Sequence, residues 1–178
     1  MSRLIKLGFE RDEFGYELEL NWDDEAFAET ATIAFEIAAS RHYLNDATAT
    51  KLEVLSVSVS IEPTKNEPPF LIIRAGGEEV VKVSLEPILN ESQILDMIPA
   101  SAYSLIFGGD PITGCLIRSG LSTTIGQIIE CKNETAGGLK WFRPRMSAIG
   151  HCLREHVPAM GARMASRALK CVFTFGIA

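Results

Sequence analysis

The sequence lacks the short motifs that identify several classes of enzyme. It contains no Cys-x-x-Cys pair, no Gly-x-Ser-x-Gly segment and no glycine-rich loop that ends in Gly-Lys-Ser/Thr. These absences argue against a clustered zinc site, a hydrolase nucleophile of the Gly-x-Ser-x-Gly type and a nucleotide-binding P-loop. The hydroxyl-rich segment 119–124 is therefore expected to be a turn.

Long apolar runs are also missing. The uncharged run from Met97 to Gly109 is shorter than the roughly 18–20 residues that a membrane-spanning helix needs. The first residues, Met1 to Lys6, contain no apolar signal core. From these two observations we expect a cytoplasmic protein with no membrane partner.

Cysteine and histidine are few and widely spaced. The spacing of the four cysteines favours reduced, isolated thiols that pack as small apolar groups; they are Cys115, Cys131, Cys152 and Cys171. The three histidines are expected to have structural roles; they are His42, His151 and His156. Residues five apart on a helix lie about 140° apart around its axis, so the last two would not share a face. The sequence therefore predicts no metal and no cofactor.

What the chain does have is charge that is divided end to end. Residues 1–139 carry 10 Lys/Arg and 22 Asp/Glu, whereas residues 140–178 carry 7 and 1. The hydrophobic fraction is 47% and the charged fraction 22%, which is typical of a globular chain with a real core. We expect one domain over 1–178, in which the basic part, 139–178, belongs to the same fold.

Period-2 alternation predicts most of the strands. Residues 1–20 are expected to form a strand pair with a turn at 10–15, and 51–62 the clearest strand, in which leucine, valine and isoleucine alternate with serine. Residues 70–74 and 80–85 are expected to form a hairpin about two glycines. Further strands are predicted at 103–107, 115–118, 124–132 and, at the end, 171–177.

Capping residues and proline positions predict the helices. Asn21 resembles a helix cap, with Asp24 at the third helical position, so a long helix is expected from there to about Leu44. A short helix should begin at Asn90, and two more should cover 144–156 and 159–170. The predicted fold class is α+β, a mainly antiparallel sheet with a long N-terminal helix and two C-terminal helices.

One segment resembles the pattern of the PD-(D/E)xK metal-dependent nucleases. Asp110 is followed about 20 residues later by a predicted apolar strand that contains Glu130 and Lys132. On a strand these two side chains project from one face, so Asp110 and Glu130 could hold Mg²⁺ while Lys132 polarises a phosphate. In this chain proline follows the aspartate, whereas the family pattern places it before. The resemblance implies an alternative function, Mg²⁺-dependent cleavage of nucleic acid.

The basic C-terminal part has three interpretations. Pairing in cis with the acidic N-terminal region is favoured, because residues 10–36 hold ten acids and one arginine. A protein-binding face is the second interpretation. The third is contact with phosphate or nucleic acid, for which the candidate anion-binding residues are Arg143, Arg145 and Arg154.

Taken together, these patterns favour binding over catalysis. We expect a non-catalytic protein-binding domain of the inhibitor and immunity type, or of the adaptor and chaperone type. Its partner would be another protein, basic in character, because opposite charge speeds association. The residues expected to form the acidic binding surface are Glu17, Glu19, Asp23, Asp24 and Glu25.

Overall fold

A single antiparallel sheet organises the chain. The structure, a computed structural model, describes residues 2–23, 32–44, 51–64, 67–85, 89–107, 110–136 and 143–175. The six strands pair in sequence order, each antiparallel to the next. They are β1 (Ser2–Arg11), β2 (Phe14–Asp23), β3 (Ile33–Tyr43), β4 (Glu53–Thr64), β5 (Glu67–Ala75) and β6 (Glu78–Ser84). The predicted α+β class with an antiparallel sheet is confirmed.

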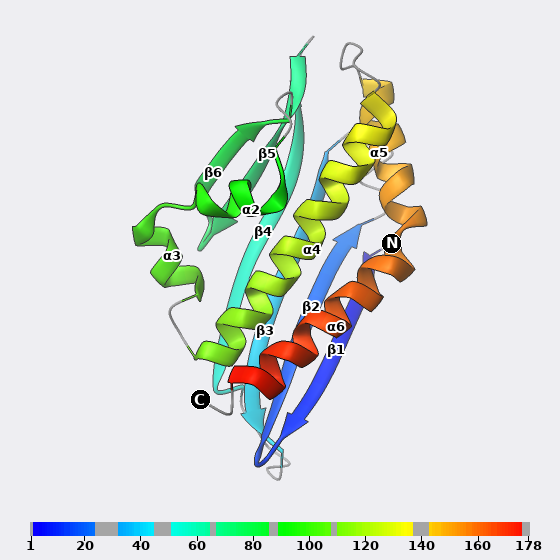
Figure 1. Ribbon diagram of the computed structural model, residues 1–178. Helices are drawn as coiled ribbons and strands as arrows, with labels where there is room; N and C mark the ends of the chain where they lie inside the picture. The colour runs from blue at the N-terminus through cyan, green and yellow to red at the C-terminus, as the bar shows by residue number, and fades with distance from the viewer. Residues whose placement is uncertain are drawn as a thin grey trace.

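The described helices lie on one face of this sheet (Figure 1). They are α2 (Glu91–Asp96), α3 (Ala100–Phe107), α4 (Pro111–Ala136), α5 (Arg143–Glu155) and α6 (Val157–Phe175). The long helix α4 crosses β2, β3 and β4, and α6 lies beside α4 and above β1. Helices α2 and α3 pack against the other side of α4. Residues of one sheet face are therefore buried under helices, whereas no described helix covers the opposite, outer face.

Alternation along the strands produces this division into two faces. The inner face is apolar and buried, and its central residues include Leu18, Leu20, Ile37, Val59 and Ile73. The outer positions between them carry mostly serine, alanine and charged side chains. Burial of one face and hydration of the other is the expected behaviour of an antiparallel sheet.

Several local predictions are confirmed. The strand pair at the N-terminus, the serine-rich strand and the hairpin are present as β1–β2, β4 and β5–β6. Gly76 and Gly77 both have positive φ angles, 60° and 81°, as a tight two-residue hairpin turn requires. Asn90 caps α2, and Gln93 closes the reciprocal capping box.

The predicted long N-terminal helix is wrong. Strand β2 continues to Asp23 and β3 begins at Ile33, while residues 24–31 lie outside the described segments. In β3 the side chains alternate between the two sheet faces, with Phe35 buried and Ala34 exposed. The capping pattern of Asn21 and Asp24 indicated a helix, but the pairing of β3 with β2 and β4 decided the outcome, because β propensity depends strongly on neighbours.

The strands predicted between 103 and 132 are also wrong, because this region forms α3 and α4. Helix α4 is surrounded by the sheet and by four helices, so apolar and β-branched residues occupy nearly all its sides. Such a helix shows no 3.6-residue periodicity. Ile112, Ile117, Ile125 and Ile128 are all buried within it, and this enrichment in isoleucine resembles a strand composition.

The two C-terminal helices are confirmed as α5 and α6, with bounds close to those expected. The final strand is not present over its described part, because α6 continues through Cys171 to Phe175. Within the described residues, no helix is both long and apolar enough to cross a membrane.

Candidate functional site

Two disulfides join the helices, and they overturn the prediction of reduced, isolated thiols. Cys115 of α4 is bonded to Cys171 of α6, and Cys131 of α4 is bonded to Cys152 of α5. The sequence separations are 56 and 21 residues. The sequence interpretation failed because a correct assignment of α4 is needed before Cys115 and Cys131 can be placed on one helix. The even number of cysteines was the available signal.

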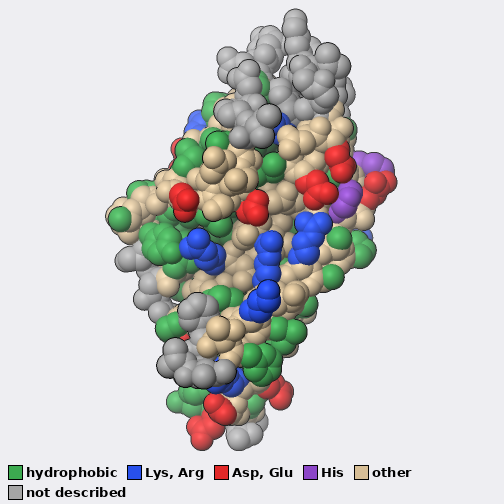
Figure 2. Space-filling view, in the orientation of Figure 1, with side chains coloured by type: hydrophobic (Ala, Val, Ile, Leu, Met, Phe, Trp, Pro, Cys, Tyr) green, Lys and Arg blue, Asp and Glu red, His purple; other side chains and the backbone are tan. Residues whose placement is uncertain are grey.

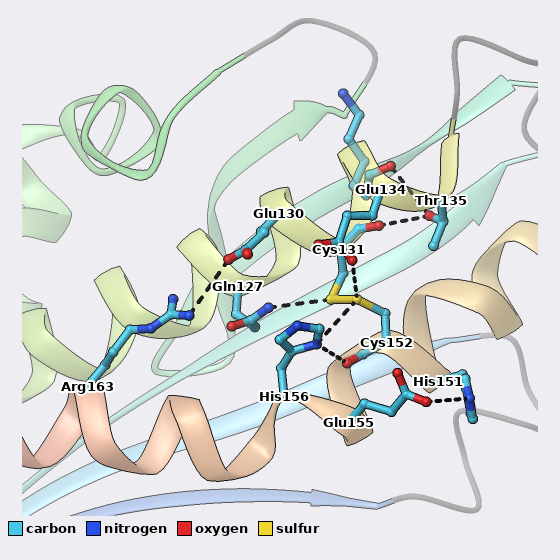
Figure 3. The surroundings of a disulfide bond; sticks show 11 residues. Gln127, Glu130, Cys131, Glu134, Thr135, His151, Cys152, Glu155, His156 and Arg163 are labelled. Atoms are coloured by element: carbon cyan, nitrogen blue, oxygen red, sulfur yellow. Dashed lines mark hydrogen bonds and ion pairs between the residues drawn. A yellow bond between two sulfur atoms is a disulfide. The ribbon is translucent and has the colours of Figure 1, made fainter.

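The Cys131–Cys152 disulfide lies within a group of polar side chains (Figure 3). The Nδ1 atom of His156 is 3.6 Å from Cys152 Sγ, and the Oε2 atom of Glu134 is 3.4 Å from the same sulfur. The amide of Gln127 donates to Cys131 Sγ at 3.5 Å. Both cysteines are buried, His156 is half-buried and Glu134 is exposed, so the group lies at the edge of the helix layer.

Helix α4 and the junction of α5 and α6 bring these side chains together. Cys131 and Glu134 are three apart on α4, and Cys152 and His156 are four apart where α5 passes into α6; both spacings place two side chains on one helix face. The ligand-type atoms of Cys131, Cys152 and His156 all lie within 4.8 Å of one another, as do those of Glu130, Glu134 and His156. The prediction that the histidines are purely structural did not anticipate this arrangement.

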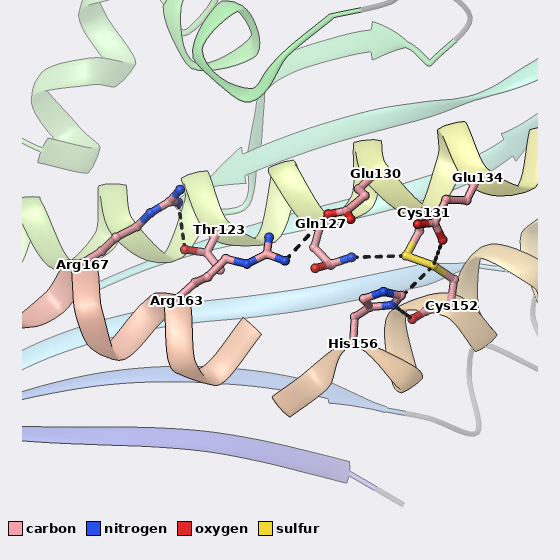
Figure 4. Close-up of polar contacts among 9 residues, drawn as sticks. All are labelled: Thr123, Gln127, Glu130, Cys131, Glu134, Cys152, His156, Arg163 and Arg167. Carbon is pink, nitrogen blue, oxygen red and sulfur yellow. Dashed lines mark hydrogen bonds and ion pairs between the residues drawn. A yellow bond between two sulfur atoms is a disulfide. The ribbon is translucent and has the colours of Figure 1, made fainter. Parts of the chain in front are cut away.

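Arginines of α6 reach across to α4 beside this group (Figure 4). Arg163 forms an ion pair of 3.8 Å with Glu130, and Arg167 donates to the hydroxyls of Ser122 and Thr123, both at 3.0 Å. On the face covered by helices, Lys and Arg side chains gather across the middle (Figure 2). Part of the basic charge of α6 is therefore bound to α4, not to the acidic N-terminal strands.

The candidate anion-binding residues are only partly placed. Arg154 is exposed on α5. Arg143 and Arg145 begin the same helix, but their side chains lie outside the described part of the structure. Nothing in the described geometry brings the three guanidinium groups into one site.

The residues of the nuclease pattern are also not brought together. Asp110 accepts a hydrogen bond from the Thr113 amide at the start of α4 and pairs with Arg41 at 3.1 Å. Glu130 lies 20 residues further along, about 30 Å at 1.5 Å per residue. That separation is too great for one magnesium ion, whose ligands lie about 2.1 Å away.

Glu130 and Lys132 both lie on α4 but point in different directions. Two residues that are two positions apart on a helix lie about 200° apart around its axis, so their side chains diverge. Glu130 is exposed, whereas Lys132 is buried, and burial lowers the pKa of its amino group. Glu130 and Lys132 would share a face only on a strand, and this segment is a helix.

Glu17 and Glu19 do lie on the outer sheet face, as the alternation predicts, but lysines pair with them. Lys6 lies 3.5 Å from Glu17 and 3.7 Å from Glu19, and Lys51 lies 3.4 Å from Glu17. Burial acts to raise the pKa of Glu17, but the two lysines outweigh it, so the pKa is lowered. Asp23 is exposed at the end of β2, and Asp24 and Glu25 lie outside the described residues.

The lowered pKa of Glu17 predicts a pH dependence of stability. A carboxyl whose pKa is lower in the folded chain stabilises the fold above its unfolded pKa, and this contribution is lost as the pH falls. Glu17→Gln should therefore cost about 0.5–1 kcal/mol at neutral pH, and almost nothing in acid, in urea unfolding curves. Glu36→Gln is the control, since Glu36 is exposed on the same face; equal losses in the two variants at neutral pH would contradict the role of the lysines.

Hollows between described residues of the outer sheet face include one at the middle and one near the β1–β2 turn. The larger, of about 610 Å³, is lined by residues that include Asn21, Glu36, Ser56, Ser58 and Arg74. The small side chains of β4 make room for it, while Arg74 is held by Ser60 and Glu62. The smaller hollow, of about 340 Å³, is lined by Glu10, Glu17 and His42 among others. The Nδ1 atom of His42 is buried without a hydrogen-bond partner.

Comparison of the chain with protein-family models, with curated proteins and with solved structures found no match.

Proposed function

We propose that the chain is a non-catalytic protein-binding domain, of the inhibitor and immunity type or the adaptor and chaperone type, which docks a basic segment of another protein on its outer sheet face. The observation that carries the proposal is the charge at the outward positions of β1–β3. At those positions of the three described strands, Lys6 is the one lysine or arginine, and the acids are Glu10, Glu17, Glu19, Asp23 and Glu36.

The shape of this face supports docking of extended side chains. Glu36, Ser56 and Ser58 line the 610 Å³ hollow, where a lysine or arginine from a partner could pair with the Glu36 carboxylate. Glu36 is exposed, so its charge can act at a distance on an approaching basic partner. The serine and alanine side chains around Glu36 are small, so a partner would have to displace few side chains to reach it.

The disulfides bear on where the binding takes place. Disulfides persist in oxidising compartments and are rare in the cytosol of most organisms. We therefore propose that the chain works in an oxidising compartment, in place of the cytoplasmic location expected from the sequence. Mass spectrometry of protein alkylated directly in its source cells tests this proposal, since labelled cysteines would contradict it.

The binding proposal is tested by charge reversal at Glu36. Short lysine- and arginine-rich peptides on an array serve as probes, and peptides that bind are measured by surface plasmon resonance. Glu36→Lys should slow association about fivefold to tenfold at low salt, and the difference should shrink as salt screens the charges.

The matched control is Glu155→Lys, which changes the net charge equally but lies on α5 in the helix layer, where Glu155 is exposed. Association of this variant should equal that of the wild type. If both variants slow association equally, only the net charge matters and the outer face has no special role. Unchanged association in Glu36→Lys would contradict the proposal directly.

A further inference from the structure

The group around the second disulfide has the composition of a zinc site. Zinc in proteins prefers thiolate, imidazole and carboxylate ligands in a tetrahedral arrangement. Helix α4 supplies Cys131 and Glu134, and the junction of α5 and α6 supplies Cys152 and His156. Two pairs of ligands on facing helices are a common way to build a metal site between helices.

The two distances from Cys152 Sγ match those between tetrahedral ligands. Zinc lies about 2.3 Å from sulfur and about 2.0–2.2 Å from nitrogen or oxygen, so ligand atoms on one ion are about 3.4–3.8 Å apart. Cys152 Sγ already lies 3.6 Å from His156 Nδ1 and 3.4 Å from Glu134 Oε2. To bind one ion, Cys131 Sγ, which is bonded to Cys152 Sγ, has to move away, and the His156 ring has to turn its Nδ1 atom from the Cys152 carbonyl.

The contact between Glu134 and sulfur is informative for a second reason. A disulfide sulfur carries no proton, so it cannot donate a hydrogen bond to the carboxylate that lies 3.4 Å away. In the reduced chain, the same two atoms can share a proton or a metal ion. The buried Oε1 atom of Gln127, whose amide donates to Cys131, also has no hydrogen-bond partner, so the polar shell around the disulfide is incomplete.

We propose that the reduced chain binds one zinc ion through Cys131, Cys152, His156 and Glu134. This inference does not depend on the proposed binding surface, because the site lies in the helix layer and not on the outer sheet face. It concerns the chain after reduction, and not the oxidised form in which we propose that the chain binds its partner. Glu134 is the carboxylate ligand in preference to Glu130, because Glu130 is paired with Arg163. Glu134 is exposed, which gives the ion a path from solvent.

Reduction is required first and can be written in full. A water-soluble phosphine breaks the sulfur–sulfur bond, water supplies the oxygen of the phosphine oxide, and its two hydrogens end on the two sulfurs. Zinc then displaces both thiol protons. The Nδ1–H group of His156 donates to the Cys152 carbonyl oxygen, and the two heavy atoms lie 2.8 Å apart. For Nδ1 to bind zinc, this hydrogen bond has to break and the proton has to move to Nε2. Disulfide and zinc exclude each other, so an oxidant should release the ion.

Cobalt(II) is the probe, because thiolate–cobalt bonds give charge-transfer absorption in the near ultraviolet. Titration of the phosphine-reduced chain should give this absorption with one equivalent of cobalt, and zinc should remove it. The oxidised chain should show none. His156→Ala should weaken cobalt binding more than about tenfold, and Cys131→Ser should lower the charge-transfer intensity.

The matched control is His151→Ala, because His151 lies on α5 next to Cys152 but pairs with Glu155 at 3.0 Å; this variant should bind cobalt as the wild type does. The proposal is overturned if His156→Ala binds equally well, or if the absorption survives in Cys131→Ser/Cys152→Ser. Should reduction unfold the chain, zinc must restore its circular dichroism spectrum, since an ion that binds the folded form stabilises it; failure to refold would equally overturn the proposal.

Discussion

Replacing Cys115 and Cys171 together by alanine is expected to lower the free energy of unfolding by about 4 kcal/mol. The disulfide closes a loop with a sequence separation of 56, and the loss of chain entropy in the unfolded state grows with the logarithm of that length. A domain of this size has a total stability of about 5–15 kcal/mol. Urea unfolding curves of the oxidised wild type and the variant measure the difference.

The second disulfide provides the comparison. It closes a separation of 21 residues, so Cys131→Ala/Cys152→Ala should cost about 3 kcal/mol. The shorter loop lies inside the longer one, so each bond limits what the other adds. Reduction of both bonds should therefore cost more than either pair of substitutions and less than their sum. A larger loss at Cys131 and Cys152 than at Cys115 and Cys171 would contradict this entropic account.

The second large effect is expected where α4 touches the sheet. Gly120→Ala should destabilise the chain by about 2 kcal/mol, because a β-carbon at this position would lie 2.7 Å from Cγ2 of Ile37 and 3.5 Å from Cδ1 of Leu18. Both neighbours are fully buried, so the helix or β3 must shift to admit the methyl group. The change in urea midpoint, at unchanged slope, is the measurement.

Gly126→Ala is the matched control on the same helix. A β-carbon there would meet nothing closer than the Glu91 carboxyl group at 3.8 Å. Because alanine favours helix over glycine, this substitution should raise stability by about 0.5–1 kcal/mol. In an Ile37→Ala background the cost of Gly120→Ala should fall, as coupling between touching residues requires. An equal cost in both backgrounds would show that the strain does not lie at the contact between Gly120 and Ile37.

The candidate site was predictable only in part. Alternation placed Glu17 and Glu19 on one face of a strand, and that placement is confirmed. Their pairing with Lys6 is a consequence of the β1–β2 register. The group formed by Cys131, Glu134, Cys152 and His156 could not be found from spacing, because its residues come from α4 and from the junction of α5 and α6, and the sequence predicted strands in place of α4.

Period and local capping were therefore enough to predict the strands other than β3, the Gly76–Gly77 turn, the Asn90 cap and the two C-terminal helices. These features depend on residues close in sequence, whose pattern survives in any tertiary context. The tertiary structure alone decided that β3 is a strand, that α4 is a helix and which cysteines meet. A segment buried on every side carries no periodic signal, and contacts between distant residues depend on how the helices pack over the sheet.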